Sequence, residues 1–145
     1  MTDKKLRKAG IIFSVIIMTF IFIMSARNGT ESDRDSMGLL ELFVSGNLVS
    51  QLNVIVRKCA HMAEFAALSF SVFLHLSGCK KVRRKYISAI TFSALYAVSD
   101  ELHQYFVPGR SCQIGDVLFD TAGAVIGAAV CLFLIKAKKD KKHGL

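Results

Sequence analysis

Three short runs of ionisable and amide side chains interrupt the apolar stretches of the sequence. Their members are Arg57, Lys58, His61, Glu64, Asp100, Glu101, His103, Gln104, Asp116 and Asp120. Imidazole and carboxylate groups act as general acids and bases, and the same groups ligate divalent metal ions. Because ionisable groups inside membrane-spanning segments are costly, each of these residues needs a structural or functional reason.

Candidate roles follow from chemical type. The candidates for acid–base catalysis are His61, Glu64, Asp100, Glu101 and His103. The candidates for ligand binding are Arg57, Lys58, Gln104, Arg110, Asp116 and Asp120, of which the three cations suit a phosphate or carboxylate. A divalent metal ion would find nitrogen and oxygen ligands in His61, Glu64, Glu101, His103 and Asp116. The H-x-x-E and D-E-x-H-Q spacings are each a weak metal signal.

The composition is that of a membrane protein. The chain has 145 residues, of which 52% are hydrophobic, and a single proline; its mean hydropathy is +0.43. The net charge of +8 comes from short basic clusters between apolar runs, without interleaved aromatic residues. This pattern excludes a nucleic-acid platform and indicates topology determinants. The length predicts one domain, residues 1–145.

Four segments are long enough to cross a hydrocarbon layer of roughly 30 Å as helices. They run approximately over residues 9–26, 57–77, 86–106 and 114–135. The sequence therefore predicts an all-α, polytopic integral membrane protein with four transmembrane helices. A cleaved signal peptide is the alternative for the first segment, but the large Met24 disagrees with a small-x-small cleavage site.

The basic clusters predict the orientation of the chain. Most of the 19 Lys and Arg residues lie in the stretches 4–8, 80–85 and 136–142. With four spans, these three stretches fall on one side of the membrane, and the positive-inside rule makes that side cytoplasmic. We therefore expect a multi-pass protein of the plasma membrane with both termini in the cytoplasm.

The connection between the first two segments is long and has two parts. Residues 27–36 are polar, whereas residues 37–56 keep a helical spacing of apolar residues that Ser45-Gly46-Asn47 interrupts. We expect one or two helices in this apolar part, lying at the outer interface or re-entering the protein and partly roofing it. The alternative is that the apolar part extends the second transmembrane helix toward its N-terminus.

Alternating helix direction brings the ionisable groups to one depth. They lie at the outer ends of the second, third and fourth segments, whereas the inner halves are almost free of charge. Such a layer predicts a polar cavity that opens to the outside. The structural alternative is that these groups only hydrogen-bond to one another and hold the helices together.

Two other patterns have simpler interpretations. Gly123 and Gly127 form a G-x-x-x-G step, which predicts close helix packing; the partner is another helix of the chain or a second copy. The four cysteines show no C-x-x-C spacing, and a disulfide between Cys59 and Cys112 is an alternative to free thiols.

The polar runs carry a family resemblance. The blocks R-K-x-x-H-x-x-E-F-A-x-L from Arg57, D-E-x-H-Q-x-x-V-P-G-R from Asp100, and D-x-x-x-D-x-x-G-x-x-x-G from Asp116 resemble those of the VanZ-like membrane protein family. The resemblance covers residues 54–130 approximately. Two departures are Asp120, where the family usually has Asn, and Ser111-Cys112-Gln113, where the family is usually rich in Gly and Ser.

The resemblance implies a context in the cell envelope. By this resemblance the chain is similar to the accessory protein of glycopeptide-resistance clusters that confers low-level resistance to teicoplanin. A housekeeping role in the envelope is equally compatible with the resemblance. The implied partners are membrane lipids and either a lipid-linked cell-wall precursor or a lipoglycopeptide. Three hypotheses follow for the polar layer: an enzyme, metal-dependent or not; a non-catalytic binder or shield; and a proton or ion path, against which the apolar inner halves argue.

Overall fold

The computed structural model describes residues 3–42 and 48–143, and the regular structure in these ranges is entirely helical. The elements are α1 (Asp3–Ser25), α2 (Gly29–Glu41), α3 (Leu48–His75), a 3-10 turn (Leu76–Gly78), α4 (Val82–Tyr105) and α5 (Ile114–His143). The predicted all-α fold is confirmed. The predicted break at residues 45–47 lies outside the described residues.

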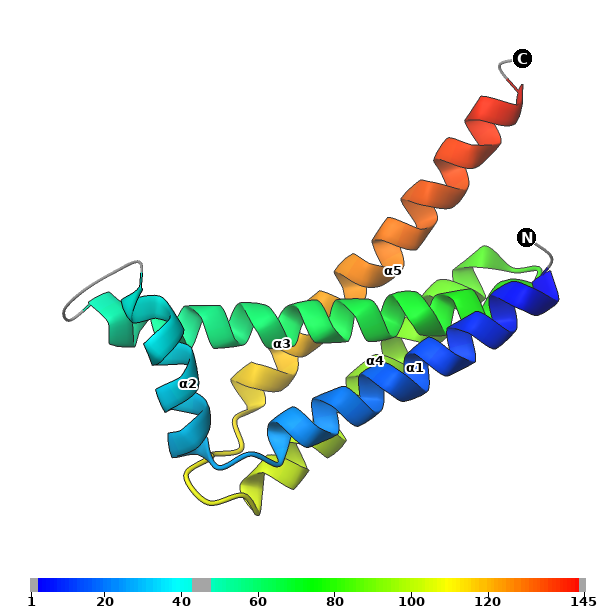
Figure 1. Cartoon of the computed structure of the whole chain (residues 1–145). Coiled ribbons are helices and arrows are strands. Elements are labelled where there is room, and N and C mark those ends of the chain that lie inside the picture. The colour runs from blue at the N-terminus through cyan, green and yellow to red at the C-terminus, as the bar shows by residue number, and fades with distance from the viewer. Residues whose placement is uncertain (1–2, 43–47, 144–145) are drawn as a thin grey trace.

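Helix α3 is the centre of the fold, because it packs against each of the other four α-helices. Figure 1 shows α1, α3 and α4 running side by side, while α5 crosses α3 and its C-terminal part projects from the bundle. The crossing of α3 and α5 depends on Gly123 and Gly127. A Cβ at either position would overlap the backbone carbonyl of Met62 or Ala66 in α3. The G-x-x-x-G step thus packs within the chain, and an oligomer of copies stays a prediction.

The distribution of apolar residues is the reverse of that in a soluble protein. The buried core contains small side chains beside a few large ones, among them Ile21, Phe65 and Leu68. Large apolar side chains of every long helix are exposed, for example Ile12 at 59% and Leu95 at 66%. An apolar outer surface of this extent suits contact with lipid.

Three helical stretches are long and apolar enough to span a membrane: Asp3–Ser25, Leu48–Gly78 and Ile114–Ala137. Helix α4 is not among them because it begins with basic residues and ends with Asp100, Glu101 and His103. Its polar and small residues nevertheless face inward, with Ala89, Ser93 and Ala97 fully buried. The count of four spans therefore stays a prediction, which this inward stripe favours.

The two ends of the bundle differ in chemistry. At one end the Ser77 hydroxyl donates to the Asp3 carbonyl (3.2 Å) and Lys85 Nζ donates to the Ser77 carbonyl (3.0 Å), so two basic clusters lie together. At the other end the Gly29 N–H donates to the Pro108 carbonyl (3.1 Å). This bond joins the α1–α2 turn to the α4–α5 connection, where Gly109 adopts a left-handed φ of 75°.

The apolar part of the long connection differs from our main expectation. Residues 48–56 form no separate interfacial helix but the first turns of α3, as in the alternative, because no Gly or Pro stands between them and Arg57. The helix in this connection that does stand apart, α2, starts earlier, at Gly29, where the Asn28 side chain caps it by accepting from the Thr30 N–H (3.2 Å). The location of α2 relative to the membrane stays a prediction.

Candidate functional site

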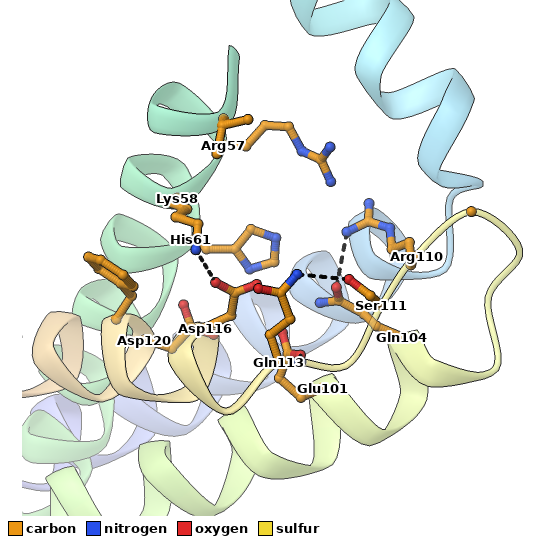
Figure 2. Close-up of a pocket in the computed structure, with 13 residues that line it drawn as sticks. Arg57, Lys58, His61, Glu101, Gln104, Arg110, Ser111, Gln113, Asp116 and Asp120 are labelled. Atoms are coloured by element: carbon orange, nitrogen blue, oxygen red, sulfur yellow. Dashed lines mark hydrogen bonds and ion pairs between the residues drawn. The ribbon is translucent and has the colours of Figure 1, made fainter. Parts of the chain in front are cut away.

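A polar cavity of about 200 Å³ lies where α3, the end of α4 and the start of α5 meet. Eight of the residues singled out from the sequence line it: Arg57, Lys58, His61, Glu101, Gln104, Arg110, Asp116 and Asp120. Figure 2 shows the guanidinium groups of Arg57 and Arg110 on one side of the cavity, and Glu101, Asp116 and Asp120 on the opposite side. The imidazole of His61 points between them. The predicted convergence of three helices is therefore present.

An ion pair joins α3 to the start of α5. Lys58 Nζ lies 2.5 Å from Asp116 Oδ1, and the same ammonium lies 4.9 Å from the centre of the Phe119 ring. Both charged side chains keep about a third of their surface exposed, 34% for Lys58 and 28% for Asp116. The pair closes one wall of the cavity while remaining accessible to water.

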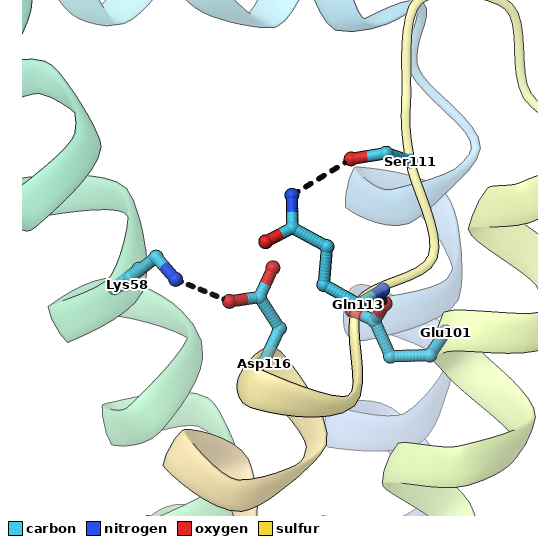
Figure 3. A network of polar contacts seen from close by, with 5 residues as sticks. All are labelled: Lys58, Glu101, Ser111, Gln113 and Asp116. Atoms are coloured by element: carbon cyan, nitrogen blue, oxygen red, sulfur yellow. Dashed lines mark hydrogen bonds and ion pairs between the residues drawn. The ribbon is translucent and has the colours of Figure 1, made fainter.

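The loop that leads into α5 is bound to α4 by a carboxylate. Glu101 Oε2 accepts the backbone N–H of Gln113 at 2.9 Å, and the Gln113 side chain donates to the Ser111 hydroxyl at 2.9 Å (Figure 3). Gln113 is the residue directly before the first turn of α5, whose N–H groups have no helical acceptor. Glu101 thus fixes where α5 begins, and with it the position of Asp116.

Arg110 connects the loop between α4 and α5 to the end of α1 through hydrogen bonds. Its guanidinium donates to the backbone carbonyls of Met24 and Arg27, each at 3.1 Å, and to the Gln104 side-chain oxygen at 3.2 Å. The carbonyls at a helix C-terminus lack intrahelical donors, so an arginine is a suitable partner for them. Arg110 is therefore both a cavity wall and a structural clamp.

Asp100 lies behind the cavity and does not line it. Its Oδ2 accepts from the Ser25 hydroxyl (3.0 Å) and from Gln104 Nε2 (2.8 Å), and only 4% of the residue is exposed. Gln104 in turn receives Arg110 on its oxygen. Asp100 therefore supports the cavity wall through Gln104 from outside the lining, and the catalytic role expected from the sequence stays a prediction.

Two further candidates also lie outside the cavity lining. The His103 ring stacks on Phe22 of α1, with 4.6 Å between centroids. Glu64 stands one turn further along α3 than His61. Among the described residues, neither Glu64 Oε2 nor His103 Nε2 has a hydrogen-bond partner, and both atoms are buried. The helical spacing that placed them near His61 and Gln104 is correct. The packing of the neighbouring helices nevertheless puts His61 and Gln104 in the cavity lining and leaves Glu64 and His103 outside it.

Asp120 occupies a distinct place on the cavity wall. It is 1% exposed, it lines the cavity, and its Oδ2 has no hydrogen-bond partner in the part of the chain that the structure describes. The other two carboxylates of the lining have partners, Gln113 for Glu101 and Lys58 for Asp116.

Comparison with known protein families adds the missing context. A family model described as VanZ/LLP1 matches residues 10–135. The chain belongs to the VanZ/LLP1 family. The match extends beyond the three motif blocks and includes α1 from Gly10 onward and all of α2. Comparisons with curated proteins and with solved structures give no match.

With three helices of spanning length, this VanZ/LLP1 chain is a membrane protein. Its candidate metal ligands do not converge: within residues 3–42 and 48–143, no three of His, Cys, Asp or Glu are arranged to hold a metal ion. Glu64 and His103 lie outside the cavity lining that contains His61, Glu101 and Asp116. No step through a metal ion is therefore derived. All four cysteines are free thiols, so the alternative of a disulfide between Cys59 and Cys112 is wrong.

Several residues of the VanZ/LLP1 site were not predicted. Ser25, Ser111, Gln113 and Phe119 contact the charged groups described above. Ser25 carried a weak signal, since it is a polar residue that ends an apolar helix. The others carried none, because the contacts of Gln113 with Glu101 and of Phe119 with Lys58 depend on how α5 packs.

Proposed function

We propose that this VanZ/LLP1 protein binds the phosphate or carboxylate group in the headgroup of a lipid-linked envelope ligand at the outer leaflet of the plasma membrane. The observation that carries the proposal is the polar cavity, which lies between helices that expose many large apolar side chains. A ligand with a lipid anchor would rest its chains on that apolar surface and place its headgroup among Arg57, Lys58 and Arg110.

The side chains of the cavity suit a phosphate or a carboxylate. Guanidinium groups present paired N–H donors that match these anions, and an ammonium adds a point charge. Figure 2 supports this because Arg57 and Arg110, which both line the cavity, approach it from different segments. A second cationic element, Lys58, lies on the same helical face as His61 and is accessible.

The size of the cavity limits what it can enclose. Pockets for drug-sized ligands measure about 300–1,000 Å³, whereas this cavity measures about 200 Å³. It suits a headgroup or one functional group of a larger molecule. Within a teicoplanin-resistance context, the protein would therefore engage a lipid, a lipid-linked precursor or a single group of the antibiotic, with the rest of that molecule outside.

The distribution of charge supports the proposed location at the outer leaflet. The basic clusters of the N-terminus and of the α3–α4 connection lie together at one end of the bundle, and the cavity lies at the other. The C-terminal lysines extend on α5 away from the cavity (Figure 1). If the basic end is cytoplasmic, the cavity faces the outer leaflet.

Lipid retention tests the proposal directly. Wild-type protein and Arg57→Gln would be purified in mild detergent from the same membranes, and bound lipid would be measured by native mass spectrometry. We expect Arg57→Gln to lower retention of phospholipid by about tenfold, since a hydrogen bond to a charged group contributes about 1.5–3 kcal/mol. Arg34→Gln is the matched control, because Arg34 is exposed on α2 and lies outside the cavity lining. Equal retention in all three proteins would refute the proposal.

A second candidate function is enzymatic, and the presence of His61 in the cavity beside Glu101 and Asp116 favours it. In that case the same cavity would modify the lipid headgroup by acid–base chemistry. Mass spectrometry of envelope lipids and teicoplanin sensitivity would be compared for cells with wild type and with Glu101→Gln at equal membrane expression. A new lipid product in wild type alone supports an enzyme. Unchanged lipids with lost resistance support binding.

A further inference from the structure

The unpartnered carboxylate of Asp120 points to the second half of the ligand. Asp120 is almost fully buried and lines the cavity, and its Oδ2 has no hydrogen-bond partner among the described residues. A buried carboxylate oxygen without a donor costs free energy, because burial removes its water without replacement. An occupant that brings a donor to this oxygen would recover that cost.

The surroundings of Asp120 favour a cationic donor over a neutral one. The acidic groups that act on it electrostatically are Asp100 and Glu101 of α4, Asp116 one turn earlier on α5, and Glu64 of α3. Lys58, a cation of the lining, already pairs with Asp116. Like charges crowded at this depth are stabilised most by a positive group that also donates hydrogen bonds, such as a primary ammonium.

Metal ions fit this position less well. No three of His, Cys, Asp or Glu within the described ranges are arranged as metal ligands. Glu101 and Asp116 already use an oxygen for Gln113 and Lys58, respectively. Within the lining, the buried oxygen that lacks a hydrogen-bond partner among the described residues belongs to Asp120, and one such side chain suits an ammonium better than a cation that needs several oxygen ligands.

Resting on the proposed headgroup binding, we propose that the cavity selects a zwitterionic headgroup, with its phosphate at Arg57 and Arg110 and its primary ammonium at Asp120. The two guanidinium groups and the acidic wall stand on opposite sides of the same cavity (Figure 2). A phosphate bearing a short primary amine matches this polarity, and its size suits a cavity of about 200 Å³. Phosphatidylethanolamine and free phosphoethanolamine share this chemistry.

Lipid competition tests the selection. Purified full-length protein would be reconstituted in vesicles with equimolar phosphatidylethanolamine, phosphatidylglycerol and phosphatidylcholine, and retained lipid would be measured by native mass spectrometry. We expect wild type to prefer phosphatidylethanolamine by about tenfold. Phosphatidylglycerol offers hydroxyl donors instead of an ammonium, and phosphatidylcholine offers a cation without N–H donors. Soluble phosphoethanolamine added in excess shows whether the lipid anchor is needed: displacement of the lipid means that the headgroup suffices, and both results are compatible with the selection.

The variant Asp120→Asn keeps the size of the side chain and removes its charge. It should lose the preference for phosphatidylethanolamine while retaining phosphatidylglycerol. Asp140→Asn makes the same change on the exposed C-terminal part of α5 and should behave as wild type. Wild type that retains phosphatidylglycerol equally well, or Asp120→Asn that keeps the preference, overturns this inference alone. Wild type that retains no lipid overturns the proposed function as well.

Discussion

At the scale of single residues, the site contains carboxylates that differ in their hydrogen-bond and ion-pair partners. Glu101 and Asp116 each hold one partner at the cavity wall, whereas Asp100 supports the wall from behind. Asp120 is the lining carboxylate with a buried oxygen that has no hydrogen-bond partner among the described residues. The four acids therefore differ in the contacts that they make, because helix packing places different groups beside each of them.

The support from Asp100 leads to a prediction about stability. In Asp100→Asn the new amide cannot keep both hydrogen bonds that Ser25 and Gln104 donate to the carboxylate at full strength. It has lost the negative charge of the acceptor, and its NH₂ group adds donors that face Gln104. We expect the loss to cost about 1.5–3 kcal/mol, the range for hydrogen bonds to charged groups. Thermal unfolding in detergent would show a lower Tm, together with weaker lipid retention because Arg110 loses its support. An unchanged Tm would contradict the hydrogen-bonded chain from Ser25 through Asp100 and Gln104 to Arg110.

Sequence reasoning at this scale succeeded for residue types and failed for some directions. The i, i+4 spacing correctly put Arg57 and His61 on one face of α3, and both line the cavity. The same reasoning grouped Asp100, His103 and Gln104, yet only Gln104 reaches the cavity. Spacing gives the angles between side chains on one helix, but the neighbours that each side chain meets are set by tertiary packing.

At the scale of elements, the site depends on the close crossing of α3 and α5. Gly123 and Gly127 lie against the backbone of α3, and the two helices carry Lys58 and Asp116. Small residues let transmembrane helices approach closely, and the contact is then held by van der Waals packing. A change in the distance between these helices would therefore be transmitted to the ion pair.

Gly127→Ala tests this crossing. The added Cβ would overlap the Ala66 carbonyl, and neither backbone can yield cheaply, so we expect a destabilisation of about 1–3 kcal/mol. Gly115→Ala is the matched control on the same helix, since no atom lies within 4 Å of a Cβ at Gly115. The measurement is the Tm of both variants in one detergent. Equal Tm values for Gly127→Ala and wild type would contradict the packing of α5 on α3.

The predicted helix limits were least accurate where hydropathy and helix formation differ. The second predicted segment begins at the charged residue Arg57, whereas α3 already begins at Leu48. The helix runs through Arg57 because charged residues do not stop a helix. For the same reason α5 extends through the lysines to His143. Apolar runs predict the part of a helix that lies in lipid, whereas caps and turn residues set where the helix itself ends.

At the scale of the whole molecule, the orientation of the bundle decides which leaflet the cavity faces. Helix α4 has 24 residues, or about 36 Å at 1.5 Å per residue, which is sufficient to cross the hydrocarbon layer. Its composition excludes it from the helices that are apolar enough to span, although its polar stripe faces the other helices. If α4 crosses, the connections before and after it lie on opposite sides of the membrane.

Two native cysteines report on those connections. Cys79 lies before α4 and is partly exposed, whereas Cys112 lies after α4 and is exposed. In single-cysteine variants, a membrane-impermeant maleimide should label Cys112 in intact cells and Cys79 only after permeabilisation, because the positive-inside rule predicts a cytoplasmic location for the basic end. A cysteine-free variant gives the background. Labelling of both residues from outside would mean that α4 does not cross the membrane. Labelling of Cys79 alone would mean that the cavity faces the cytoplasm, and it would contradict the outer-leaflet location in the proposed function.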